Sequence, residues 1–67
     1  MFGDNMKRNR ERLQMTQREL GERLNLSQPT IAQLERGSKQ PSVTTLNEMS
    51  EIFSCTVDSL TKGATTT

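Results

Sequence analysis

Residues 16–37 read TQRELGERLNLSQPTIAQLERG, a segment that contains the signals of two successive helices. Thr16 and Glu19 have the spacing of a capping box, which predicts that a helix begins directly after Thr16. Ser27 precedes a second apolar-periodic segment, and its hydroxyl can cap a second helix. Because only a short polar connection separates the two predicted helices, we expect them to cross steeply.

The rest of the chain also has helical periodicity, and no segment alternates with a period of two for long enough to form a strand. Ser42 and Thr56 are expected to cap further helices, and Gly37 to end the helix that precedes them. The sequence therefore predicts an all-α, compact fold of five helices at residues 4–14, 17–24, 28–36, 43–53 and 57–61. We expect one domain over residues 1–62 and a flexible tail over 63–67, which has nothing to bury.

Composition narrows the class of protein. The chain has 67 residues, which is near the lower limit for a domain that folds alone. It contains no histidine, no phosphate-cradling glycine loop and no evident carboxylate pair, so we expect no enzyme activity, no metal and no cofactor. The single cysteine, Cys55, suits a reducing cytoplasm. No apolar run is long enough for a membrane span, so we expect no membrane association.

The charges are divided unequally along the chain. Residues 1–40 carry eight Lys/Arg and five Asp/Glu (8 − 5 = +3), whereas residues 41–67 carry one base and three acids (1 − 3 = −2). This division points weakly to a polyanionic partner for the N-terminal half, although a solvated helical face explains the charges equally well.

Two charges fall on helical stripes that should face inward. Arg10 follows Met6 by four residues, and Glu35 follows Ile31 by four. A lone buried charge is costly, so we predict that Arg10 and Glu35 form an ion pair that joins the first helix to the third. The alternative is that both side chains extend to water at the edge of the stripe. Leu13 and Val43 are also expected on inward faces.

The outward arc of the third helix has an unusual composition for a solvated face. Its residues are uncharged apart from the last: Gln28, Pro29, Ala32, Gln33 and Arg36. Glutamine amides can bond adenine in the major groove, and small apolar groups can contact thymine methyls. Ser27 lies at the start of the same helix. Each glutamine alone could be ordinary surface, so the prediction of base contact rests on the whole arc, Ser27, Gln28, Pro29, Ala32 and Gln33.

Two groups of residues are candidates for phosphate contact. Thr16 and Gln17 lie at the N-terminus of the second helix, where free N–H groups and the helix dipole favour an anion. Arg36, Lys39 and Gln40 lie at or just beyond the end of the third helix, where they can reach a DNA backbone.

Residues 16–37, together with Pro41-Ser42 and the closing Val57-Asp58-Ser59-Leu60, resemble the Cro/CI-type (XRE-like) helix-turn-helix of lambdoid phage repressors. The resemblance covers residues 4–62 and implies a lambda-repressor-like fold. It also implies that positions 28, 29 and 33 face bases, that Gln17 and the 36–40 loop face phosphates, and that Arg10 pairs with Glu35. The chain departs from the family pattern at Asn25 and Ser54, where glycine is frequent, and at Pro29, whose base readout is reduced to a methyl contact or to shape.

The resemblance implies a transcriptional regulator, a repressor that binds a palindromic operator in double-stranded DNA as a homodimer. Cys55, Val57 and Leu60 are expected at the dimer interface; alternatively, Val57 and Leu60 simply close the core. A different class of function remains open, in which an antitoxin-like or accessory helical module binds proteins and no specific DNA. Steep dependence of binding on salt would favour the DNA-binding reading.

Overall fold

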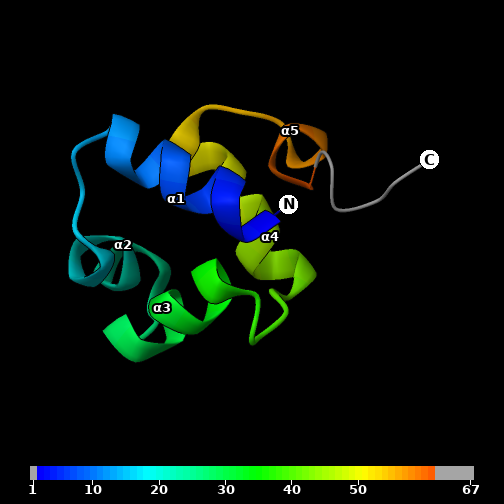
Figure 1. Cartoon of the computed structure of the whole chain (residues 1–67). Helices are drawn as coiled ribbons and strands as arrows, with labels where there is room; N and C mark the ends of the chain where they lie inside the picture. The colour runs from blue at the N-terminus through cyan, green and yellow to red at the C-terminus, as the bar shows by residue number, and fades with distance from the viewer. Residues whose placement is uncertain (1, 62–67) are drawn as a thin grey trace.

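The computed structural model describes residues 2–61, in which helices surround one hydrophobic core. Five α-helices follow one another in these residues, with no strand among them (Figure 1). They are α1 (Phe2–Arg12), α2 (Gln17–Leu24), α3 (Gln28–Arg36), α4 (Val43–Phe53) and α5 (Val57–Thr61). The expected all-α class is confirmed, and α2 to α5 have the expected bounds. Residue 62 and the expected flexible tail, 63–67, lie outside the described residues.

The first helix differs from its expected range of 4–14. It ends two residues earlier because Gln14 adopts a left-handed backbone conformation, with φ of 59°. The N–H of Gln14 donates to the carbonyl of Glu11 at 2.9 Å, and the N–H of Met15 donates to the carbonyl of Arg10 at 3.1 Å. These bonds satisfy carbonyls that the helix end would otherwise leave unpaired. The helix also begins earlier, at Phe2, which packs against the core.

Hydroxyl caps set the starts of the other helices, as the sequence predicts. Each hydroxyl oxygen accepts a hydrogen bond from the backbone N–H three residues later, which satisfies one of the free donors of the first turn. The distances are 3.0 Å for Thr16, 3.3 Å for Ser27, 3.1 Å for Ser42 and 3.0 Å for Thr56. At Thr16 the box is complete, because its own N–H donates to Oε1 of Glu19 at 2.8 Å.

All five helices contribute to the core. Its buried side chains are Met6, Leu20, Leu24, Ile31, Leu34, Met49, Phe53 and Leu60. Burying each large side chain of this kind contributes about 1.5–3 kcal/mol. The expectation that Leu13 and Val43 face inward is wrong, since they are 40% and 74% exposed. Leu13 lies beyond the end of α1, and Val43 is the first residue of α4.

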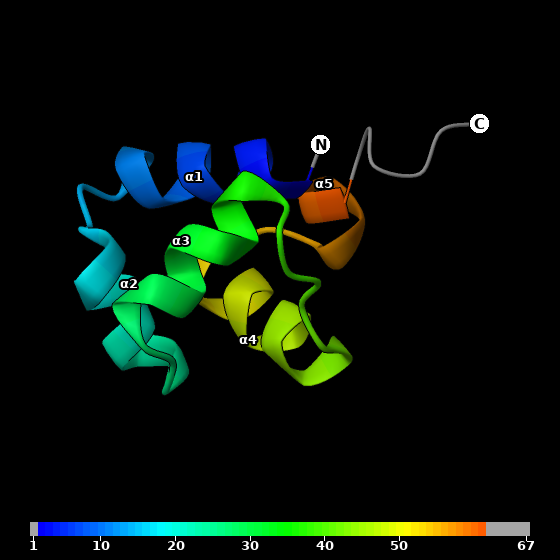
Figure 2. The ribbon, with the colours of Figure 1, turned by 60° about the horizontal axis from the view of Figure 1, so that its bottom comes forward.

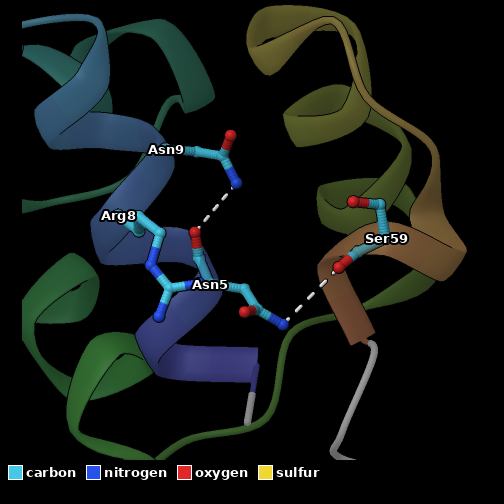
Figure 3. Close-up of a pocket in the computed structure, with 4 residues that line it drawn as sticks. All are labelled: Asn5, Arg8, Asn9 and Ser59. Carbon is cyan, nitrogen blue, oxygen red and sulfur yellow. Dashed lines mark hydrogen bonds between the residues drawn. The ribbon is translucent and has the colours of Figure 1, made fainter.

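Helix α1 is tied to the carboxyl ends of three other helices. Arg12 donates through Nη2 to the carbonyl of Phe53 at 2.9 Å, at the end of α4. Asn5 donates through Nδ2 to the carbonyl of Leu60 at 2.8 Å, in α5, and more weakly to that of Ser59 (Figure 3). Gly3 is buried against the carbonyl oxygen of Glu35, with no room for a β-carbon. The end of α3 therefore lies at α1, while its start points away (Figure 2).

Candidate nucleic-acid interface

Helices α2 and α3 meet through a tight turn of three residues. Asn25 begins it with φ of 59°, a left-handed conformation that asparagine tolerates better than most side chains. The N–H of Leu26 donates to the carbonyl of Gly21 at 2.7 Å, which closes the turn over α2. A β-carbon at Gly21 would lie 2.5 Å from the carbonyl oxygen of Leu26. The mid-helix glycine therefore accommodates the close return of the chain onto α2.

The turn holds α3 so that one side is buried and the opposite side faces solvent. Ile31 and Leu34 are 0% and 2% exposed and anchor the helix in the core. The residues expected to contact bases lie away from this buried side. Ser27, Gln28 and Pro29 are exposed, and Ala32 and Gln33 are half-buried. We call these five residues the α3 arc. The Ser27 hydroxyl already caps α3 and pairs with the hydroxyl of Thr30 at 2.8 Å.

Arg10 and Glu35, the two inward-facing charges, are in direct contact. Arg10 donates through Nε to Oε2 of Glu35 at 2.7 Å and through Nη2 to Oε1 at 3.3 Å. Its Nη1 donates to the carbonyl of Met15 at 2.8 Å, just before α2. The side chains of the pair are 10% and 5% exposed. The hydrogen bond to Glu35 raises the pKa of Arg10, against the opposing effect of burial, so the guanidinium remains charged.

Glu35 also begins a chain of hydrogen bonds that leads to the α3 arc. Its Oε1 accepts from Nε2 of Gln17 at 3.0 Å. Oε1 of Gln17 in turn accepts from Nε2 of Gln28 at 2.7 Å. The side-chain amide of Gln28 is thus held in position by a hydrogen bond to Gln17 of α2. From the sequence, Gln17 was predicted to contact phosphate and Gln28 to contact bases, each independently. The hydrogen bond between their amides could not be predicted, because it depends on how α2 and α3 cross.

The residues expected to contact phosphate occupy two separate places. Thr16 and Gln17 stand at the start of α2, where the Thr16 hydroxyl is engaged in the capping box. Arg36, Lys39 and Gln40 are exposed at and beyond the end of α3. The chain turns there at Gly37, with φ of 85°. A nine-residue helix is about 13 Å long, so Arg36 lies roughly one helix length from Gln28. Gln17 therefore lies beside the start of α3, and Arg36 lies at its end.

The residues expected at a dimer interface are not equally exposed. Leu60 is 0% exposed within the monomer, so the expectation that its side chain faces a partner is corrected: it closes the core. Cys55 and Val57 are half-buried and retain some accessible surface. Burial raises the pKa of the Cys55 thiol, and the charge of Arg12 partly offsets this. The exposed Val43 adds an apolar side chain that the sequence had placed in the core.

Outside α2 and α3, the described residues offer few groups that could bind a ligand. A hollow of about 280 Å³ between α1 and α5 is lined by Asn5, Arg8, Asn9 and Ser59, which supply amides, a hydroxyl and one cation (Figure 3). Within residues 2–61, no three acidic, cysteine or histidine residues gather as metal ligands would. Nor does any helix in that range have the length and apolar character needed to span a bilayer.

Comparison with known proteins gives a consistent result. A family model described as helix-turn-helix matches residues 6–60. Among curated proteins, the chain is similar to YqaE of Bacillus subtilis (strain 168), described as an uncharacterized HTH-type transcriptional regulator. The two are 33% identical over 63 residues, which cover 94% of this chain and 54% of YqaE. The chain thus spans about half the length of that relative.

Solved structures are similar over nearly the whole chain. The P22 c2 repressor in complex with synthetic operator 9T has a TM-score of 0.87 and 30% identity, over 94% of this chain and 96% of that one. The solution structure of the P22 c2 DNA-binding domain has a TM-score of 0.85 and is 29% identical, and the match covers 98% of this chain and 87% of that one. FeII HppE in complex with substrate has a TM-score of 0.83 and is 25% identical, and the match covers 96% of this chain but only 36% of that one. The five-helix arrangement is thus that of a repressor DNA-binding domain.

Proposed function

This chain belongs to the helix-turn-helix family of DNA-binding transcriptional regulators, and we propose that it is a sequence-specific repressor that reads double-stranded DNA with α3 in the major groove. The observation that carries the proposal is the supported position of Gln28. Its amide lies on the exposed side of α3, held by Gln17 at 2.7 Å. A glutamine amide can bond both N6 and N7 of adenine, and the bond to Gln17 holds this amide in place before DNA binds. Pro29, Ala32 and Gln33 extend the reading surface along the same helix.

Phosphate contacts on both sides would fix the position of α3. The start of α2 supplies the backbone N–H of Gln17, since the N–H and hydroxyl of the neighbouring Thr16 are both bonded to Glu19. Arg36, Lys39 and Gln40 supply an exposed segment with two cations. The protein acts by binding rather than by catalysis and needs no cofactor or metal. Its place of action is the cytoplasm, where its DNA partner is present.

The repressor would bind a palindromic operator as a homodimer, with half-sites about 34 Å apart. Cys55 and Val57 are the proposed contact residues, since each keeps accessible surface while Leu60 does not. A single small domain makes few contacts with DNA, so pairing on DNA would supply the missing affinity.

Selection from a randomised duplex library, followed by salt titration of the selected site, tests the proposal. We expect a two-fold symmetric sequence and an affinity that falls steeply with salt. Gln28→Ala should weaken binding by about 1–3 kcal/mol and relax preference at one base pair per half-site. Equal weakening on all sequences would make Gln28 a backbone contact. No DNA binding even at low salt would refute the proposal in favour of a protein-binding module.

A further inference from the structure

We propose that Glu35, whose side chain is only 5% exposed and lies on the inner side of α3, determines which purine Gln28 recognises. It would do so by fixing the orientation of two side-chain amides, those of Gln17 and Gln28. The inference rests on the proposed function, because it concerns how the same surface selects a base. Glu35 is accordingly a positioning residue for specificity.

The first step is that Glu35 can only accept hydrogen bonds. It is paired with Arg10 at 2.7 Å, and its side chain is 5% exposed. A carboxylate has acceptors only, and a guanidinium has donors only. Oε1 of Glu35, the atom nearer to α2, therefore requires a donor from whichever side chain approaches it.

The second step is that this requirement sets both amides. Gln17 must turn its NH₂ group toward Glu35, where the distance is 3.0 Å, and its oxygen must then face Gln28. Gln28 must in turn present its NH₂ group to that oxygen, at 2.7 Å. The opposite orientation of Gln17 would place its oxygen against the carboxylate. Without Glu35, both orientations of the amide chain would be equally well bonded.

The third step is that amide orientation decides between purines. With its nitrogen held by Gln17, Gln28 keeps an acceptor oxygen and one further N–H for the base. Adenine offers a donor at N6 beside the acceptor N7, whereas guanine offers acceptors at both O6 and N7. Reversing the amide exchanges the places of acceptor and donor. The Gln28 atom that faces the 6-position of the purine then changes from the oxygen, which accepts from N6 of adenine, to the nitrogen, which donates to O6 of guanine.

The decisive variant is Glu35→Gln. Arg10 has donors only, and its shorter bond runs from Nε to Oε2 at 2.7 Å, so the single oxygen of the new amide keeps that place. The NH₂ group then takes the place of Oε1, where it gives up the longer 3.3 Å bond from Nη2 and donates to Gln17. Gln17 and Gln28 then reverse. At the base pair read by Gln28, we expect the preference for adenine over guanine to fall on the order of tenfold or more, with other base pairs unaffected. Competition binding with the selected site and its single-base variants measures this ratio.

Four further variants separate amide orientation from charge and stability. Glu22→Gln makes the same change of charge at an exposed position of α2 and should leave every base preference intact. Arg10→Lys weakens the buried pair but keeps the carboxylate, so the adenine preference should persist. Arg10→Met with Glu35→Met removes the pair without leaving a buried charge, so it should fold and still lose the preference. On a Gln17→Ala background, Glu35→Gln should cause no additional change.

A readout in the free protein is independent of DNA. The side-chain NH₂ signals of Gln17 and Gln28 should both shift in Glu35→Gln, while those of Gln33 and Gln40 stay unchanged. Only the NH₂ group of Gln28 should exchange faster, because the reversed chain leaves it without its bond to Gln17. A folded Glu35→Gln protein with the wild-type purine ratio would overturn the inference and leave the proposed function standing. A wild-type protein that selects no sequence at all would overturn both.

Discussion

The replacement of Arg10 by methionine tests the buried pair on which the domain depends. Arg10 donates two hydrogen bonds to Glu35 and one to the carbonyl of Met15. After the replacement, Glu35 would keep only the amide of Gln17, with its side chain 5% exposed. Removing one partner of such a pair costs about 3–5 kcal/mol, because the remaining charge stays buried without compensation.

This cost is large for a chain of this size. A 67-residue domain has a free energy of unfolding of roughly 3–10 kcal/mol, so Arg10→Met should be close to unfolding at room temperature. Urea titration followed by far-ultraviolet circular dichroism measures the loss. Combining Arg10→Met with Glu35→Met should recover most of it, since an apolar pair can replace a buried ion pair at little cost.

Arg18→Met is the matched control. Arg18 pairs with Glu22 at 3.6 Å, but its side chain is 82% exposed, so the same substitution should cost less than about 0.5 kcal/mol. If Arg10→Met lowered the unfolding free energy no more than Arg18→Met, or if the double variant were as unstable as the single one, the buried pair would not have the role assigned to it.

Three other predictions follow from the described geometry. Leu60→Ala should cost about 2–5 kcal/mol in urea titration, equally at all protein concentrations; a loss that grew on dilution would place Leu60 at an interface after all. Gly37→Ala should cost about 1–2 kcal/mol, purely through its φ of 85°, because a β-carbon there meets no atom within 4 Å; a neutral result would show that α3 can end differently. Burial raises the pKa of Cys55, so the thiol favours the folded state below the unfolded pKa of about 8.5, and this contribution is lost as pH rises through the folded value. The unfolding free energy should therefore fall more steeply at alkaline pH in the wild type than in Cys55→Ser. If the Cys55 thiol of the folded protein were alkylated as fast as that of the protein unfolded in urea, the raised pKa would be contradicted.

Several features could be predicted because local chemistry decides them. Hydroxyl caps at Thr16, Ser27 and Ser42 act on N–H groups three residues away, so the starts of these helices depend on nearby sequence alone. The contact between Arg10 and Glu35 was also predictable, since two charges on inward stripes each need a partner.

Other features depend on how helices are placed in three dimensions. The bond between Gln17 and Gln28 requires the crossing of α2 and α3, which periodicity does not specify. The burial of Leu60 was ambiguous because α5 is only five residues long, too short to show a periodic face. Gly3 gave no signal either, since its contact is with the distant carbonyl of Glu35. The DNA and dimer contacts themselves stay predictions.

The division of α3 into a buried side and an exposed arc has an evolutionary consequence. Ile31 and Leu34 hold the helix in the core, whereas Gln28, Pro29 and Gln33 contribute little to it. Mutation can therefore exchange the exposed side chains at positions 28 and 29 at little cost in stability, whereas Ser27 must be retained as the cap of α3. Duplicated copies of such a domain could diverge in the sequences they recognise while sharing one scaffold. The same separation makes this chain a suitable recipient for grafted recognition residues, provided that the glutamine at position 17 is matched to the new residue at 28.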